Sequence, residues 1–344
     1  MPDLSVNVGA LRLRNPVMPA SGCFAIEYNE ALDFTQLGAL VVKSVSPASR
    51  PGNPTPRVTE TVHGMLNSIG IPSRGIDYYR DHVLRAYTRY GTPVVVSVSA
   101  DTADSFAQAC EALSLPEVAA IEANISCPNL EADGMAFGMD AQTTRQVVEA
   151  IRRRTRHPLW VKLTPNASHI AAIARAAEEG GADAVVMGNT VLGMSIDVRT
   201  RQPSLGNVMG GLSGPSIKPI ALRLVYQCHR AISIPVIGCG GIQSADDAVE
   251  FMLAGASAVQ VGTASFRDPG VMQKIIDGLA AYCVEQRVDS IAALTGRVEI
   301  DAQLNERWAR FCGATPVHVP VDGLEPTLPN GQDNHRGRIL AGTP

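Results

Sequence analysis

The chain has 344 residues, enough for one large α/β barrel or two smaller domains. It is 45% hydrophobic and 18% charged with a net charge of −4, which excludes the strongly basic balance typical of nucleic-acid-binding proteins. The slightly acidic balance also argues against binding to an anionic membrane surface.

The amino terminus and the cysteine pattern indicate a cytoplasmic protein. Residues 1–7 have neither a cationic flank nor an apolar core, so we expect no signal peptide, and no apolar run reaches the ~18 residues of a membrane helix. The seven cysteines are odd in number, scattered and never spaced C-x-x-C. This pattern favours reduced thiols and predicts neither a metal site nor an iron–sulfur cluster on this chain.

The periodicity of the sequence predicts a hairpin followed by eight strands. Residues 4–13 alternate about Gly9-Ala10, which predicts a hairpin that closes the bottom of a barrel. The later runs are continuously apolar or β-branched, as parallel strands buried on both faces require. The predicted strands are residues 17–20, 39–42, 94–98, 119–123, 159–163, 184–187, 235–238 and 258–261.

Amphipathic segments of helical length separate most of these strands. The predicted helices are residues 75–90, 103–113, 141–154, 168–179, 216–229, 245–253 and 271–285. Helix start signals stand at Asp101 or Thr102, at Ser168 and at Ser244.

Eight strand–helix units predict a single (β/α)8 TIM barrel. The alternative is a doubly wound open sheet, but the G-x-G-x-x-G fingerprint of that fold is absent. The nearest match, residues 238–243, has Gln243 at its last position.

Polar residues or glycines stand at the carboxyl end of every predicted strand, which is the functional rim of such a barrel. Turns also favour these residue types, so the rim is informative only as a set. The rim residues are Ser21-Gly22, Lys43-Ser44, Ser97, Asn124 with Cys127, Lys162, Asn189-Thr190, Gly240-Gly241 and Gly262-Thr263.

The glycines after the last two strands predict a phosphate-binding site. Because glycine has no Cβ, a phosphate can come close to the backbone N–H groups at the starts of the two following helices. Residues 210–214 open the helix of the sixth unit and add a further backbone donor. Ordinary turn glycines are the alternative interpretation.

Lys43 and Lys162 stand at strand ends, where a lysine charge needs an anionic partner such as a reduced flavin. For either lysine alone, the alternative is a side chain that extends its ammonium to solvent at the rim.

Residues 124–129, Asn-Ile-Ser-Cys-Pro-Asn, place the thiol of Cys127 between two carboxamides just past a strand end. A core cysteine beside a turn is the alternative interpretation. Carboxamides also stand at Asn67 and Asn189, and a group of asparagines at one mouth suits a ligand that displays both amide donors and acceptors. A cysteine thiolate serves as a base when its pKa falls from ~8.5 toward the operating pH.

Together these motifs resemble class 1 dihydroorotate dehydrogenases, the flavin enzymes that make orotate in pyrimidine synthesis. The similar stretches run in family order over roughly residues 4–300. They are residues 52–57, Gly64-Met-Leu-Asn-Ser-Ile-Gly70, Asn124–Asn129, Val161-Lys-Leu-Thr-Pro-Asn166, Asn189-Thr190, Gly206-Asn207, Gly210-Gly-Leu-Ser-Gly-Pro215, Lys218-Pro219, Gly238-x-Gly-Gly-Ile242 and Val261-Gly-Thr263.

The resemblance implies one FMN per chain, with Cys127 as the catalytic base. The FMN-binding residues that it implies are Ser21, Lys43, Ser44, Ser97, Asn124, Lys162, Gly188, Gly214, Gly240, Gly241, Gly262 and Thr263. The substrate-binding residues that it implies are Lys43, Asn67, Ser68, Ile69, Gly70, Ile71, Asn124, Asn129, Asn189 and Thr190. Family members often have Asn where Ser97 stands, and the quinone-linked class 2 has Ser where Cys127 stands.

Within class 1 the chain resembles the NAD-linked 1B catalytic subunit more than the fumarate-linked subtype. That resemblance implies a homodimeric core and a separate subunit carrying FAD and a 2Fe–2S cluster, with two copies of each chain. The alternatives are fumarate as acceptor, another FMN barrel enzyme such as a dihydropyrimidine or dihydrouridine dehydrogenase, and a non-catalytic flavin-binding subunit.

Residues 1–312 are expected to form the barrel domain, and the Pro- and Gly-rich residues 313–344 an irregular tail.

Overall fold

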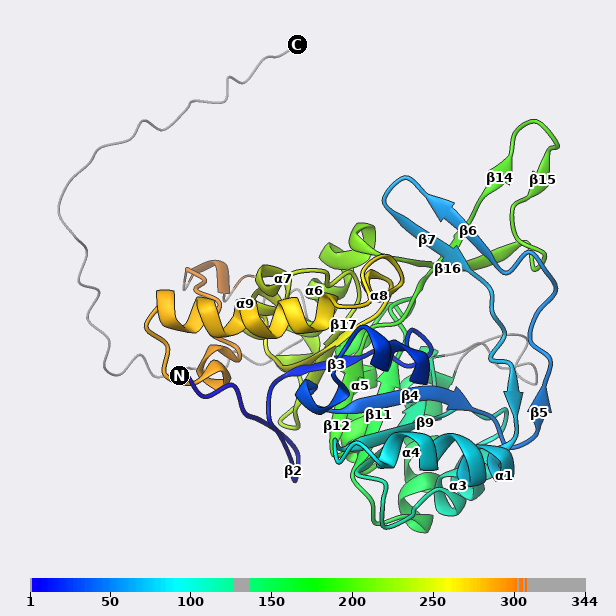
Figure 1. Cartoon of the computed structure of the whole chain (residues 1–344), viewed down its shortest axis with the longest axis horizontal. Helices are drawn as coiled ribbons and strands as arrows, with labels where there is room; N and C mark the ends of the chain where they lie inside the picture. Colours follow the sequence, from blue (N-terminus) through cyan, green and yellow to red (C-terminus); the bar gives the residue numbers. More distant parts are fainter. Residues whose placement is uncertain (1, 127–136, 302, 306, 308–344) are drawn as a thin grey trace.

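A computed structural model describes residues 2–126, 137–301, 303–305 and 307. Its centre is an eight-stranded parallel sheet in the order β3-β18-β17-β12-β11-β10-β9-β4. The strands are β3 (Val17–Pro19), β4 (Leu40–Val45), β9 (Val94–Val98), β10 (Ala120–Asn124), β11 (Leu159–Leu163), β12 (Ala184–Met187), β17 (Val236–Cys239) and β18 (Ala256–Val261). All eight predicted strands are confirmed, and the sheet curves into a nearly closed (β/α)8 barrel (Figure 1).

The barrel strands are buried on both faces, which explains their continuously apolar sequences. Every residue of β9, β10, β11, β12 and β17 is buried. Five buried polar residues nevertheless lie inside these strands and β18, namely Ser97, Glu122, Asn124, Lys162 and Gln260. Polar groups so deep in a core must find partners within the barrel itself.

The barrel closes where β4 approaches β3. Gly38 N donates a hydrogen bond to Val17 O (2.9 Å) just before β4 begins. A Cβ on Gly38 would stand 2.2 Å from the backbone oxygen of Asn15, so only glycine allows the two chain segments to come this close. The predicted hairpin, β1 (Val6–Val8) and β2 (Leu11–Leu13), is present. Its turn lies against Asp183, just before β12, and therefore at the amino-terminal end of the barrel.

Helices surround the barrel, with α3 and α4 on one side and α7 and α9 on the other (Figure 1). The helices that follow the strands are α3 (Ala103–Ala112), α4 (Ala141–Arg154), α5 (Ile170–Glu179), α6 (Lys218–His229), α7 (Ala245–Leu253), α8 (Ala264–Arg267) and α9 (Val271–Glu285). The predicted helix at residues 75–90 consists of α1 (Ile76–Tyr78), a π-helical turn (Tyr79–Leu84) and α2 (Arg85–Thr88). Short 3-10 turns are Ile26–Glu30, Phe34–Gln36, Phe137–Met139, Pro215–Ile217 and Ile291–Leu294.

Two of the three predicted helix starts are confirmed. Thr102 and Ser244 form capping boxes with Ser105 and Asp247, so side chains satisfy the first free N–H groups of α3 and α7. The prediction for Ser168 is wrong. The N-cap of helix α5 is His169, whose side chain makes no capping hydrogen bond, and the His169 carbonyl accepts from the N–H groups of Ala172 and Ile173.

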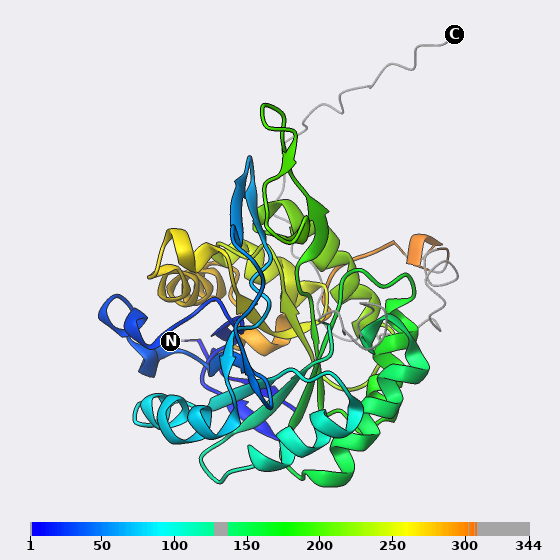
Figure 2. The ribbon, with the colours of Figure 1, turned by 90° about the vertical axis from the view of Figure 1, so that its right-hand side faces the viewer.

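The sequence patterns did not predict an antiparallel sheet that projects beyond the barrel (Figures 1 and 2). Its strands are β6 (Val58–Thr61), β7 (Gly64–Asn67), β13 (Val191–Met194) and β16 (Met209–Ser213). Two further pairs are β14 (Ile196–Asp197) with β15 (Gln202–Pro203) and β5 (Ser49–Arg50) with β8 (Ser73–Arg74). Residues 210–213, predicted to open a helix, belong to β16 instead, and only Gly214 leads into the 3-10 turn before α6.

None of the helices among the described residues combines the length and the apolar character needed to span a bilayer. The predicted tail, residues 313–344, lies outside the described part of the chain.

Gly38→Ala is expected to destabilise the protein by about 1–3 kcal/mol, because the new methyl group meets backbone that cannot rotate away. Gly270→Ala is the matched control. Its Cβ would have only ordinary contacts of 3.6 Å or more, and its φ of −87° suits alanine. Urea unfolding midpoints would measure both variants. Equal stability of the two would contradict this account of barrel closure.

Candidate active site

The predicted rim residues come from neighbouring strands of the barrel. Ser44 lies near the end of β4, Ser97 in β9, Asn124 at the end of β10 and Lys162 in β11. Because the strands are parallel, their carboxyl ends meet at one mouth. Asn189 and Thr190 follow β12 directly.

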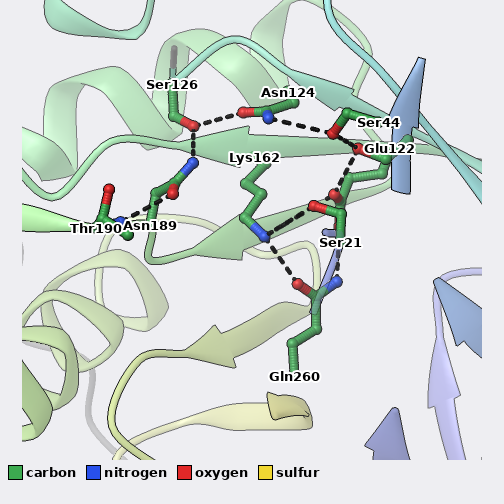
Figure 3. Close-up of polar contacts among 10 residues, drawn as sticks. Ser21, Ser44, Glu122, Asn124, Ser126, Lys162, Asn189, Thr190 and Gln260 are labelled. Carbon is green, nitrogen blue, oxygen red and sulfur yellow. Dashed lines mark hydrogen bonds and ion pairs between the residues drawn. The ribbon is translucent and has the colours of Figure 1, made fainter. Parts of the chain in front are cut away.

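Lys162 is the centre of a buried polar group in the middle of the barrel (Figure 3). The residue is 3% exposed. Its Nζ donates to Gln260 Oε1 (3.0 Å) and lies 3.5 Å from Ser21 Oγ. Glu122 Oε1 is 3.9 Å from the same ammonium, so a charged pair is enclosed in the core.

A chain of hydrogen bonds continues from Glu122 toward the mouth (Figure 3). Ser97 Oγ donates to Glu122 Oε1 (3.0 Å) and lies 2.8 Å from Ser44 Oγ. Asn124 Nδ2 reaches Ser44 Oγ at 3.5 Å. The hydroxyl of the fully buried Ser97 is therefore hydrogen-bonded to the Glu122 carboxylate and to the Ser44 hydroxyl.

The chain then crosses to the residues after β12. Ser126 Oγ donates to Asn124 Oδ1 (2.5 Å), and Asn189 Nδ2 donates to Ser126 Oγ. Asn189 Oδ1 in turn accepts from Thr190 N (2.8 Å). Two of the four predicted asparagines, Asn124 and Asn189, are thus held together through Ser126.

The predicted substrate loop, residues 67–71, comes from the projecting sheet. Asn67 ends β7 and donates to Gly211 O (3.3 Å) on β16. Asn53 holds both following residues: its Nδ2 donates to Ser68 Oγ (2.7 Å), and its backbone N–H donates to Ile69 O. Gly70 and Ile71 follow with φ values of 75° and 46°. The projecting sheet therefore anchors this loop, which is a role that the sequence did not reveal.

Lys43 differs from Lys162 in its surroundings. It is half-buried at the end of β4, and its Nζ donates to Pro72 O. Desolvation lowers the pKa of the Lys43 ammonium. The lysine borders a cavity of about 130 Å³ whose lining includes Arg74, Tyr78 and Tyr79.

The predicted glycines lie in tight turns. Gly188, Gly214, Gly240 and Gly241 all have positive φ, of 129°, 99°, 131° and 78°. A Cβ on Gly241 would stand 2.8 Å from Lys218 N, so the turn after β17 packs directly on the start of α6. Gly262 and Thr263 follow β18 and lead into α8.

The described cysteines are unsuited to act as bases. Burial raises the pKa of the thiols of Cys23 and Cys110 to about 12, and it also raises the pKa of Cys228, Cys239 and Cys283. The predicted base Cys127 and the predicted substrate ligand Asn129 lie outside the described residues.

Sequence reasoning missed Glu122, Ser126 and Gln260. Glu122 and Gln260 stand inside apolar runs, and a polar residue in the middle of a strand buried on both faces was the available signal. Ser126 stands inside the Asn-Ile-Ser-Cys-Pro-Asn motif, but nothing in the pattern gave it a partner.

Comparison with known proteins identifies the family of the chain. The family model described as dihydroorotate dehydrogenase matches residues 3–282. Proteins of this family are in general FMN-dependent.

Curated relatives described as "Dihydroorotate dehydrogenase B (NAD(+)), catalytic subunit" match most of the chain. The protein of Desulforamulus reducens is 48% identical over 301 residues, which cover 87% of this chain and 99% of the relative. The protein of Bacteroides fragilis is 45% identical over 303 residues, 87% of this chain and 100% of the relative. That of Trichlorobacter lovleyi is 48% identical over 301 residues, 87% and 99% respectively. The chain belongs to the dihydroorotate dehydrogenase family, the oxidoreductases that convert dihydroorotate to orotate in pyrimidine biosynthesis.

Proposed function

We propose that this chain is the catalytic subunit of an NAD-linked dihydroorotate dehydrogenase. The observation that carries the proposal is a buried lysine, Lys162, and a half-buried lysine, Lys43, at the carboxyl ends of two barrel strands. Their charges suit a flavin and an anionic substrate, the two ligands that this reaction brings together.

One FMN per chain fits the residues present. Lys162 is an ammonium enclosed by acceptor oxygens, which suits a flavin ring that gains negative charge on reduction. Gly240 and Gly241 pack closely on Ala221 and Lys218 of α6 and carry no Cβ of their own, which suits a turn whose backbone N–H groups approach a phosphate. The proposed FMN ligands are Ser21, Lys43, Ser44, Ser97, Asn124, Lys162, Gly188, Gly214, Gly240, Gly241, Gly262 and Thr263.

The proposed mechanism divides the work among the chain's residues. FMN, when bound, supplies the hydride acceptor for C6 of dihydroorotate. Cys127 takes the proton from C5 as a thiolate, and Lys43 holds the substrate carboxylate. Asn67, Asn124, Asn129 and Asn189 hold the pyrimidine ring, since a carboxamide both donates and accepts hydrogen bonds. Residues 68–71 and Thr190 complete the proposed substrate site.

A separate electron-transfer subunit is the proposed route to NAD. The curated relatives are described as catalytic subunits of an NAD(+) enzyme, which supports a second chain. We propose that this partner carries FAD and a 2Fe–2S cluster and that two copies of each chain assemble on a homodimeric core.

A visible spectrum of the purified chain, followed by anaerobic addition of dihydroorotate, tests the proposal. We expect a yellow protein that bleaches. A yellow protein that stays oxidised would contradict the proposed substrate, and a colourless protein that FMN does not restore would contradict the flavin site. Re-oxidation by fumarate, but not by NAD with a partner subunit, would reassign the acceptor.

Cys127→Ala is expected to keep the flavin spectrum and to lose turnover about 10²–10⁴-fold, the usual contribution of a general base. Cys283→Ala, near the end of α9, is the control and should retain turnover. Stopped-flow reduction of the flavin by dihydroorotate measures both variants. Near-native reduction of the Cys127 variant would assign the base to another residue.

Lys43→Met is expected to raise KM for dihydroorotate about ten- to hundredfold, the value of a charge-assisted hydrogen bond. Lys274→Met, an exposed lysine paired with Asp268, is the control. Because desolvation lowers the pKa of Lys43, the ammonium is present at low pH and lost as pH rises through that lowered value. In the native protein kcat/KM should therefore fall at a lower pH than an ordinary lysine would cause. Lys43→Arg should move this alkaline fall to higher pH, and an unchanged profile would contradict the assignment.

A further inference from the structure

Glu122 has no role in the chemistry described so far, yet it is a fully buried carboxylate in the middle of β10. Enclosing a carboxylate in a barrel core is unfavourable unless it is paired and hydrogen-bonded. Its two oxygens accept from Ser97 Oγ (3.0 Å) and Gln260 Nε2 (2.6 Å). Each carboxylate oxygen thus accepts one hydrogen bond, one from the neighbouring strand β9 and one from β18.

Gln260 connects this carboxylate to Lys162 (Figure 3). Its Oε1 accepts from Lys162 Nζ (3.0 Å), while its Nε2 donates to Glu122. The reverse orientation of the amide would set its N–H groups against the ammonium and its oxygen against the carboxylate. The two charges therefore fix the orientation of the amide, and the amide fixes the position of the ammonium.

Other titratable groups also face this pair. Cys23, after β3, and Cys239, at the end of β17, lie close enough to Lys162 for a charge interaction. Tyr79 stands in the same relation to Glu122. Burial raises the pKa of both thiols and of the tyrosine hydroxyl, so these groups are neutral near pH 7. Glu122 is therefore the negative charge that we pair with Lys162.

We propose that Glu122, acting through Gln260 and across a gap of 3.9 Å, is a positioning residue that keeps Lys162 protonated and fixes its ammonium in the barrel. Desolvation alone favours the neutral amine of a buried lysine, and a nearby opposite charge reverses that preference. The role of this charge at a flavin rests on the proposed function. The protonation of Lys162 does not.

The chain is well suited to a direct test because it has only four lysines, at positions 43, 162, 218 and 274. The full chain, as purified and labelled with 13Cε-lysine, gives one NMR signal for each, and Lys→Met variants assign them. A pH titration of these signals reports the protonation of each lysine separately.

Glu122→Gln removes the charge and keeps the shape of the side chain. We expect the Lys162 signal to titrate about one to three pH units lower than in the native protein, the usual effect of an adjacent opposite charge. The signals of Lys218 and Lys274 should stay in place. Glu250→Gln is the matched control, because Glu250 pairs with Lys218 (3.0 Å), so only the Lys218 signal should move.

Gln260→Met provides a second route if Glu122→Gln does not fold. It removes the bridging amide and leaves the carboxylate, so the Lys162 signal should again titrate at lower pH. At saturating dihydroorotate, flavin reduction in either variant should lose rate at high pH in step with the Lys162 signal, while the fall of kcat/KM that we assign to Lys43 should stay in place. A merely structural residue would not cause this. A Lys162 signal that titrates at the native pH in both variants would overturn the proposal.

Failure of this inference is distinguishable from failure of the proposed function. A colourless protein whose Lys162 signal shifts in Glu122→Gln would keep the positioning role and remove the flavin. A yellow protein that bleaches with dihydroorotate but shows no shift of the Lys162 signal would support the proposed function and contradict the positioning role of Glu122.

Discussion

The constraint on which this structure depends is the enclosure of polar groups by a nearly closed parallel barrel. Closure buries both faces of the strands and directs their carboxyl ends to one mouth. Buried polar side chains need partners, and Glu122, Lys162 and Gln260 supply them to one another. Their hydrogen bonds extend through Ser97 and Ser44 to the asparagines at the mouth. The same closure that stabilises the fold therefore also orders the site.

The barrel and most of its rim were predictable because buried parallel strands have continuous apolar sequences. Against that background Lys43 and Lys162 stand out, since an ammonium at a strand end needs a partner. The projecting sheet was not predictable on the same grounds. Strand β6 alternates exposed and half-buried residues over only four positions, and β7 is half-buried except at Leu66. Strand β16 contains Gly210 and Gly211, which resemble a turn. Strand β6 pairs with β7 in a local hairpin, and this hairpin joins the sheet only through the register of β7 with the distant strand β16.

Glu122 and Gln260 show the other limit of sequence reasoning. Each is one polar residue in an apolar run, and nothing local identifies its partner. The hydrogen bond between them joins residues 138 positions apart, on strands that are not neighbours in the sheet. Side chains that point into a barrel meet across its interior, and the pairing depends on strand tilt and stagger. Sequence periodicity gives the direction of a side chain but not which opposite strand it meets.

On the proposed function, Lys43 and Lys162 illustrate how the surroundings of one residue type suit it to different tasks. Lys43 is half-buried, has a carbonyl as its hydrogen-bond acceptor, and its pKa is lowered by desolvation. A cation in such a place gains most when an anionic ligand arrives, so it suits a substrate that binds and leaves. Lys162 lies beside a carboxylate that is itself fixed by two donors. Its charge is balanced before any ligand arrives, which suits a permanent partner whose charge changes during turnover. Desolvation alone favours the neutral amine of a lysine at that depth, and on our proposal the buried carboxylate keeps the ammonium charged whether or not a ligand is bound.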